Sequence, residues 1–177
     1  MISKEDIKHL EKIFPFWLDI NQNDRAKIIL SSRILSLKKN AIFFNSHDLD
    51  GLLFLKSGKL RFFLSHLEAR ELPLYYLNNM EVEFFEDFSD NSTSTILDIA
   101  FIVEKNSEIL LIPYSVLNLF RNKYSVMEKF LHNLTREKFS KSLLSLQNIL
   151  LIPLKDRLLK FLYSLNKTEI SLTHEEI

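Results

Sequence analysis

The sequence predicts an α+β fold. An antiparallel β-roll of the double-stranded β-helix (jelly-roll) type is expected between short N-terminal helices and a long C-terminal helix. The first observation is that the apolar period changes from about 3.6 residues to two at 34–112 and returns to 3.6 after Pro113. The second is that the period-two segments follow one another without helical patterns between them. Closely spaced short strands are typical of an antiparallel barrel or roll rather than of a parallel sheet.

Two short helices are predicted near the N-terminus, at 4–13 and 23–33. Ile7 and Leu10 lie on one stripe of the first helix, and Asn23 or Asp24 can open the second. The aromatic sequence Phe-Pro-Phe-Trp between these helices predicts a packed turn.

Seven strands are predicted in the central region, at 34–37, 41–44, 51–55, 59–64, 71–77, 96–103 and 109–112. Residues with turn chemistry separate them, including Ser57-Gly58, Asn78-Asn79 and Lys105-Asn106. We therefore expect a turn at each of these dipeptides.

A short helix is predicted at 114–122 and a long one at 125–150, with Ser125 as the cap of the long helix. A helix of this length with a wide apolar stripe needs partners on more than one face. We expect one face to lie on the roll and another to meet a second copy in a two-fold dimer. The alternative is a helix packed only within its own chain. The residues expected at the dimer seam are Met127, Phe130, Leu131, Leu134 and Leu144.

The last part of the chain has the pattern with which many winged helix-turn-helix domains begin. Pro153 ends the long helix, and a helical pattern restarts at 155–165. A small strand is predicted at 170–172, and Thr173 and Glu176 form a capping box after it. We expect that a further module follows in a longer protein.

The composition limits the class of protein. The 177 residues are 46% hydrophobic and 26% charged, which predicts a globular chain. Lys plus Arg and Asp plus Glu both number 23, which argues against strong binding of nucleic acid or anionic membranes by this chain itself. The absence of cysteine excludes disulfides, thiolate zinc sites and cysteine-ligated iron–sulfur clusters. No signal-peptide pattern or membrane-spanning apolar run is present, so we expect a cytoplasmic location.

Four segments carry a family resemblance. Residues 51–61, Gly-Leu-Leu-Phe-Leu-Lys-Ser-Gly-Lys-Leu-Arg, are similar to a strand–Ser-Gly–strand hairpin, and 107–113, Ser-Glu-Ile-Leu-Leu-Ile-Pro, to the last strand of a β-roll. Asp156-Arg157-Leu158 is similar to a hinge and first helix, and 170–177 to the start of a helix-turn-helix. In this order and spacing they resemble the CRP/FNR superfamily of bacterial transcription regulators, over nearly the whole chain.

The resemblance implies a cyclic-nucleotide-binding-like sensing domain at 1–124, a dimerisation helix at 125–151, and a hinge with the start of a winged helix-turn-helix domain at 152–177. It further implies a homodimer that senses a small-molecule effector and binds operator DNA through residues beyond Ile177. No nucleophile elbow, phosphate loop or HExxH pattern is present, so we expect no enzymatic activity. The rival interpretation is a β-roll that binds a ligand or a protein and has no DNA-binding role.

The sequence departs from the family at the cyclic-phosphate cassette. Nucleotide-binding members have a Gly-Glu-Leu turn followed by an Arg-Ser pair. Here Phe84 and Phe85 align with Gly-Glu, Leu97 and Asp98 align with Arg-Ser, and no arginine lies within 71–120. A phosphodiester needs a cation and a close backbone approach, and phenylalanine supplies neither. We therefore expect no binding of cyclic AMP or cyclic GMP.

Aromatic side chains in the same region predict an apolar or aromatic effector between the roll and the long helix, with polar helix residues facing a carboxylate or similar group. The alternative is a filled core, in which the rings pack on one another and no effector binds. The expected pocket residues are Tyr75, Phe84, Phe85, Leu97, Phe101, Arg136, Lys138 and Ser142.

No cofactor or metal is expected. Haem is the alternative, because some family members sense gases through it, and His132 is the best candidate ligand. The polar flanks of the histidines favour solvated surface positions; they are His9, His47, His66, His132 and His174. An acidic stretch matches no metal-binding loop pattern and is expected to be a solvated loop; it comprises Glu81, Glu83, Glu86, Asp87 and Asp90.

Overall fold

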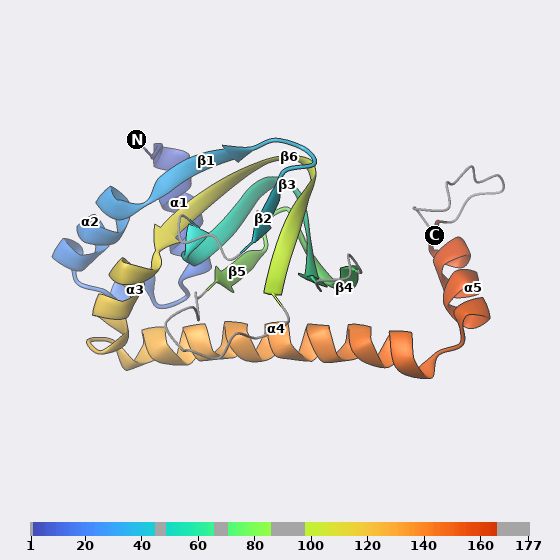
Figure 1. Ribbon diagram of the computed structural model, residues 1–177. Helices are drawn as coiled ribbons and strands as arrows, with labels where there is room; N and C mark the ends of the chain where they lie inside the picture. Colours follow the sequence, from blue (N-terminus) through green and yellow to red (C-terminus); the bar gives the residue numbers. More distant parts are fainter. Residues whose placement is uncertain (1, 45–48, 66–70, 86–97, 166–177) are drawn as a thin grey trace.

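A computed structural model describes residues 2–44, 49–65, 71–85 and 98–165 (Figure 1). The helices are α1 (Lys4–Ile13), the 3-10 helix η1 (Trp17–Asp19), α2 (Gln22–Ser31), α3 (Tyr114–Arg121), α4 (Ser125–Leu151) and α5 (Leu154–Leu165). The strands are β1 (Arg33–Leu37), β2 (Ile42–Phe44), β3 (Gly51–Ser65), β4 (Glu71–Asn78), β5 (Val82–Phe85) and β6 (Asp98–Pro113). All strand pairs among these described residues are antiparallel, which confirms the predicted α+β class.

The two long strands β3 and β6 pair with each other through both halves of the roll. In one half, β5 lies beside the start of β3, and β1 lies beside the end of β6. In the other half, β4 lies beside the end of β3, and β2 lies beside the start of β6. Each long strand therefore belongs to both halves.

The expected turns at Ser57-Gly58 and Lys105-Asn106 are wrong, because the chain continues through both as strand and only the pairing register shifts there. Gly58 has φ +110°, and a Cβ atom at this position would lie 2.0 Å from Ser107 Oγ. Glycine is therefore needed for the close approach of the two strands rather than for a chain reversal.

The helix starts differ from the expected caps. The side chain of Asn21, not Asn23 or Asp24, caps α2, because its Oδ1 accepts a hydrogen bond of 2.9 Å from the Asp24 backbone N–H. Helix α4 begins at Ser125, but the N-cap residue is Tyr124 and no side chain caps this end. The small strand at 170–172 and the capping box at 173–176 lie outside the described residues.

Buried apolar side chains form two cores. The helical core lies between the sheet and the helices, and it includes Leu10, Phe14, Ile28, Leu52, Phe54, Phe84, Leu117, Met127 and Leu131. The roll core lies inside the roll, and it includes Leu53, Leu55, Leu60, Phe62, Leu77, Phe85, Phe101 and Val103. The alternation of β3 explains the division, since Leu52 and Phe54 point to the helices while Leu53 and Leu55 point into the roll.

Helix α4 lies as a long rod beneath the roll, and its later part runs past β5 and β4 (Figure 1). The Ser145 hydroxyl donates a hydrogen bond of 2.8 Å to the Pro73 backbone oxygen of β4. Helix α5 stands apart from the roll beyond the end of α4 (Figure 1). The part of α4 after its first turns is therefore the part of the helix that lies against β4 and β5.

Candidate functional site

Four rings from four strands meet inside the roll, and we call them the aromatic cluster: Phe62, Tyr75, Phe85 and Phe101. The Phe62 ring stacks on Tyr75 at 4.9 Å between centroids and lies 5.2 Å from Phe101. The Phe85 ring meets Phe101 edge-on at 6.3 Å. The structure thus brings together three of the expected pocket residues, and Phe62 was missed.

Helix α4 adds a cation at the edge of this cluster. Lys138 Nζ lies 5.1 Å from the Phe85 ring centroid and 6.0 Å from that of Phe62. It also forms an ion pair of 3.3 Å with Glu83 Oε1 of β5. The side chains of Lys138 and Glu83 are only 18% and 7% exposed, so this ion pair is largely removed from water.

The electrostatics of the site are set by burial. Burial raises the pKa of the Glu83 carboxyl above its ordinary value, and the positive charge of Lys138 offsets only part of that rise. Burial and the neighbouring charge of Glu83 also raise the pKa of Tyr75, so the phenol keeps its proton. The buried Tyr75 hydroxyl lies near Glu83 but makes no hydrogen bond of good geometry among the described residues.

Glu83 is a residue that the sequence reasoning misplaced. The expectation of a solvated acidic loop is wrong at this position, because Glu83 is buried in β5. The signal was present in the sequence Val-Glu-Phe-Phe: strand alternation puts Glu83 on the same face as Phe85, which points into the roll core. Glu86, Asp87 and Asp90 lie outside the described residues.

The other expected pocket residues do not join the cluster. Phe84 points the opposite way, into the helical core, with its ring 6.3 Å from that of Tyr114. Arg136 is exposed, because it lies on a different face of α4 from Lys138. The Ser142 hydroxyl donates a hydrogen bond of 3.0 Å to the Lys138 backbone oxygen within the helix. Leu97 lies outside the described residues.

The residues expected at the dimer seam differ in how far they are buried. Phe130 and Leu134 pack against the helical core but are partly exposed, and their place at a seam stays a prediction. Met127 and Leu131 are buried in that core, so contacts within the chain occupy these two positions. The expectation is corrected there, because helical periodicity shows which residues share a face but not what that face meets. Leu144 is 59% exposed.

A different apolar stripe is exposed on the later part of α4. Phe139, Leu143 and Leu150 are 63%, 48% and 78% exposed. Their spacing of four and seven residues places them on one side of the helix. We call these three residues the exposed stripe.

The start of α4 is anchored by a second buried carboxylate, Asp24 of α2. Its Oδ2 accepts hydrogen bonds of 2.7 Å from the Tyr124 hydroxyl and 2.8 Å from Asn21 Nδ2, and it pairs with Lys123. Hydrogen bonds from Lys123 and Tyr124 lower the pKa of the Asp24 carboxyl below its ordinary value. Three donors therefore meet at this one oxygen, and Lys27 Nζ lies 4.0 Å from Oδ1.

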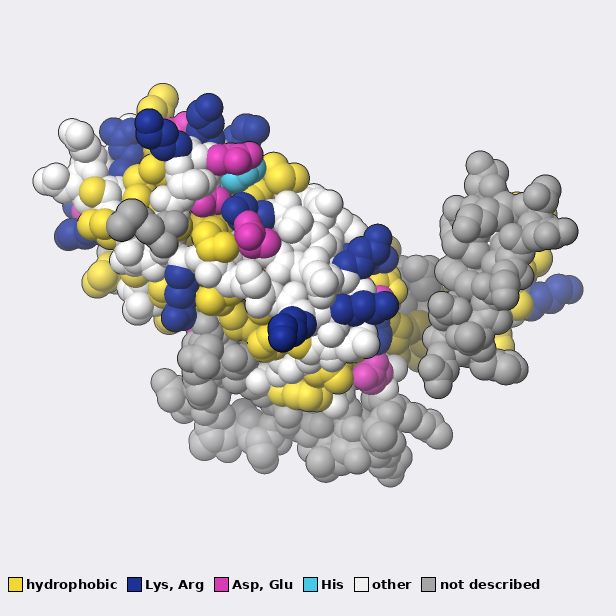
Figure 2. Space-filling view, turned by 90° about the horizontal axis from the view of Figure 1, so that it is seen from above, with side chains coloured by type: hydrophobic (Ala, Val, Ile, Leu, Met, Phe, Trp, Pro, Cys, Tyr) yellow, Lys and Arg dark blue, Asp and Glu magenta, His cyan; other side chains and the backbone are white. Residues whose placement is uncertain are grey.

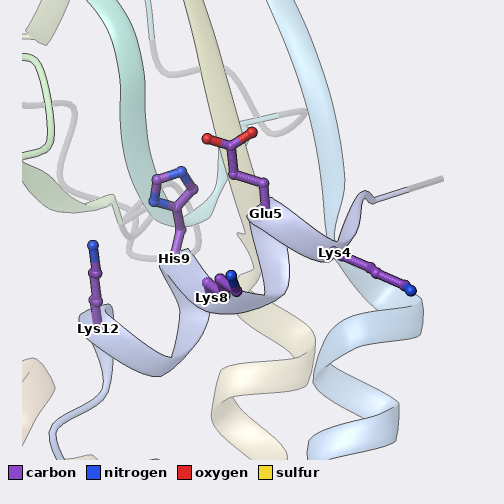
Figure 3. Close-up of a pocket in the computed structure, with 5 residues that line it drawn as sticks. All are labelled: Lys4, Glu5, Lys8, His9 and Lys12. Carbon is purple, nitrogen blue, oxygen red and sulfur yellow. The ribbon is translucent and has the colours of Figure 1, made fainter.

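A hollow of about 430 Å³ lies along α1, at the end of the molecule where Lys and Arg side chains gather in Figure 2. Figure 3 shows its lining, with side chains that come from this one helix: Lys4, Glu5, Lys8, His9 and Lys12. The His9 ring packs on Phe54 with the centroids 5.1 Å apart. The lysines of this hollow are exposed, whereas Nδ1 of His9 is buried.

The two described histidines lie in different surroundings. His9 packs on Phe54, and His132 is exposed on α4. Within 2–44, 49–65, 71–85 and 98–165, no group of three or more His, Asp or Glu side chains could hold a metal ion. His47, His66 and His174 lie outside the described residues.

The arrangement of β-roll and long helix has counterparts among solved structures. No family model and no curated protein matches the sequence. Among solved structures, a protein from Eubacterium rectale described as a transcriptional regulator of the crp/fnr family matches with a TM-score of 0.78 and 25% identity, over 93% of this chain and 78% of that one. The regulator CLP of Xanthomonas campestris matches with a TM-score of 0.59 and 17% identity, over 87% and 76% of the two chains. A CooA mutant from Carboxydothermus hydrogenoformans matches with a TM-score of 0.53 and 16% identity, over 82% and 93%.

The β-roll followed by a long helix is thus the architecture of a class of effector-responsive transcription regulators. The chain has a CRP/FNR-like domain, as the resemblance in the sequence predicted. Within the described part of the chain, no helix is both long enough and apolar enough to span a membrane.

Proposed function

We propose that this chain is the sensory and dimerisation part of a CRP/FNR-type DNA-binding transcription regulator, and that its effector is not a cyclic nucleotide. The observation that carries the proposal is the Glu83–Lys138 ion pair, because it joins the interior of the roll to the long helix. A change at the aromatic cluster would therefore act directly on α4.

The proposal that the effector is not a cyclic nucleotide rests on the residues at the position of the cyclic-phosphate cassette. Phe84 and Phe85 are 5% and 6% exposed and belong to the two cores. Neither can present a cation to a phosphate. The similar structures differ in the effectors their descriptions give, since CLP is called c-di-GMP responsive and CooA CO-dependent. A change of effector within this fold is therefore consistent with the proposal.

The proposed mechanism couples the effector to the distance between two DNA-reading heads. A sensing domain at 1–124 moves the dimerisation helix at 125–151, and the hinge at 152–156 passes that movement to a DNA-binding domain that starts within 152–177. Two heads must match successive major grooves of a two-fold operator, so a tilt or shift of α4 changes DNA affinity.

Dimerisation is assigned to the exposed stripe rather than to residues in the helical core. We expect the chain to elute from size-exclusion chromatography with light scattering at twice its mass of 20.9 kDa. Leu143→Asp places a charge in the stripe and should give monomers, because a buried unpaired charge is strongly unfavourable at an interface. Leu30→Asp is the matched control, since Leu30 is 84% exposed on α2.

A monomeric wild-type chain, or a Leu143→Asp variant that remains dimeric, would contradict this assignment. Calorimetric titration with cyclic AMP and cyclic GMP tests the other part of the proposal. We expect no heat of binding from either nucleotide. Saturable binding of either one would contradict the proposal that the effector is not a cyclic nucleotide.

A further inference from the structure

The ion pair between β5 and α4 has a further property, because its existence depends on a single proton. We infer that the Glu83–Lys138 pair is a pH-sensitive latch, which holds the middle of α4 against the roll while Glu83 is ionised and releases it when Glu83 takes up a proton from solvent. This inference rests on the proposed function, because it names a way in which the contact between the sensing domain and the helix is regulated.

The first argument is the position of the two charges. Glu83 belongs to β5 and Lys138 to α4, and 3.3 Å separates Glu83 Oε1 from Lys138 Nζ, so the ion pair joins two separate elements. Both side chains are largely shielded from water. Water and salt screen such a pair less than an exposed one, so the charge of Glu83 makes a large difference to this contact.

The charged and titratable groups that face Glu83 come from β4 and α4. The Tyr75 hydroxyl of β4 lies near the carboxylate and keeps its proton, because burial and the charge of Glu83 raise the pKa of Tyr75. Lys138 faces Glu83 from α4, and Lys141 of the same helix acts on it as a second positive charge. The neighbouring strand β3 places an apolar leucine opposite Glu83.

The two other described carboxylates nearest to this contact have partners of their own. Glu137 pairs with Lys141 at 2.9 Å within α4. Glu81, which precedes β5, accepts a hydrogen bond of 2.7 Å from the Asn78 backbone N–H. Of the two residue types in the latch, only glutamate ordinarily titrates on the acidic side of neutral pH. Acidification therefore acts on the latch through Glu83.

The surroundings of Glu83 favour proton uptake. The carboxyl group is buried, and burial raises the pKa of Glu83 more than the charge of Lys138 lowers it. Release of Lys138 removes a charge that stabilises the ionised form, so the released state binds the proton more tightly than the attached state does. A difference of one pKa unit between the two states would make release about tenfold more favourable when Glu83 is protonated.

Protonation changes the middle of α4 and not its start. Without its anion, the Lys138 ammonium is better solvated in water, and its flexible stem allows it to turn outward. The middle of the helix then keeps its packing and the hydrogen bond from Ser145 to β4. Met127 and Leu131 stay buried in the helical core whatever the charge of the latch. We therefore expect release to be confined to the turns around Lys138.

Solution NMR of the whole chain over a series of pH values tests the latch. The carboxyl carbon of Glu83, identified by its absence in Glu83→Gln, should titrate with a midpoint above 4.5. The backbone amide of Lys138 should shift with the same midpoint. Below this midpoint the hydrogen-exchange protection factors around Lys138 should fall about tenfold, as for one pKa unit, while those at Met127 should not change.

Glu83→Gln imitates the protonated state at every pH. Its protection factors around Lys138 at neutral pH should equal those of acidified wild type, and they should not change with pH. Glu137→Gln is the matched control, because it removes a carboxylate of α4 that is 61% exposed and lies outside the latch. This control should titrate as wild type does.

The inference is overturned if Glu83 titrates at or below 4.5, or if the Lys138 amide does not follow its titration. It is also overturned if Glu83→Gln protects the middle of α4 at neutral pH as fully as wild type does. A dimer that shows no such titration would refute the latch and leave the proposed sensory role standing. A monomer that titrates as expected would support the latch and refute the proposed dimerisation.

Discussion

The first turns of α4 and its middle turns are attached to the rest of the chain in different ways. At the start, Met127 and Leu131 are buried in the helical core, and Asp24 Oδ2 accepts hydrogen bonds from Asn21 and from Tyr124, the residue before α4. In the middle, the attachments include the Glu83–Lys138 ion pair and a hydrogen bond from Ser145. The beginning of the helix is thus fixed by close packing, while its middle is held by polar contacts that can be exchanged.

The carboxylates of Asp24 and Glu83 show the same contrast. Asp24 has a lowered pKa because cationic and hydroxyl donors surround it, whereas burial gives Glu83 a raised pKa despite its ion pair. A lowered pKa marks a charge that the fold stabilises, and a raised one marks a charge that the fold tolerates at a cost. From this difference we expect the start of α4 to be held more firmly than its middle.

The largest effect on the free energy of unfolding is expected from a substitution in the first turns of α4. Leu131→Ala should lower the free energy of unfolding by about 2–5 kcal/mol, because it leaves a cavity in the helical core. Leu144→Ala, at a site that is 59% exposed, should change it by less than about 0.5 kcal/mol. Urea unfolding of both variants measures the difference, and equal losses would show that the two parts of α4 are packed alike.

A smaller effect is expected at the middle of the helix. Lys138→Met should lower the free energy of unfolding by about 1–3 kcal/mol, because Glu83 remains buried without its cation. Adding Glu83→Gln should restore part of the loss, since the uncompensated charge is then gone. A double-mutant cycle by urea unfolding gives the coupling between the two side chains, and a coupling near zero would mean that the ion pair does not hold α4.

The smallest effect is a pair of opposite pH dependences. The pKa of Glu83 is raised above 4.5 in the folded state. Between 4.5 and this raised pKa the folded state binds more protons than the unfolded state, so stability falls as pH rises. The folded-state pKa of Asp24 is lowered below 3.8, so its contribution is present above 3.8 and is lost as pH falls through the folded value. Unfolding of wild type, Glu83→Gln and Asp24→Asn across acidic to neutral pH should separate the two slopes. Curves of equal shape for the three proteins would contradict both directions.

Much of the fold follows from periodicity. The long helix was expected at 125–150 and lies at Ser125–Leu151, because a helical pattern over many residues is hard to mistake. Strand β5 was missed because it is four residues long and carries Glu83 in an acidic stretch. Strands β3 and β6 were each split in two because Ser57-Gly58 and Lys105-Asn106 have turn chemistry, and only pairing with the other strand shows that they are continuous.

The sequence predicted the candidate site only in part, because the register of β5 could not be predicted from it. An aromatic-rich segment indicated rings in the roll, and Tyr75, Phe85 and Phe101 do lie together. The orientation of Phe84 and the burial of Glu83 both depend on the strand register that the acidic stretch concealed. Met127 and Leu131 were misassigned to the seam because apolar spacing does not distinguish a face that meets its own core from one that meets a second molecule.

The continuity of β3 and β6 has a mechanical consequence. Since both strands run through both halves of the roll, the two halves share one ladder, and the register shifts between Leu55 and Leu60 are its least regular part. We expect the slowest-exchanging amide hydrogens to come from the regular stretches of these two strands on either side of the shifts, and faster exchange at the shifts themselves.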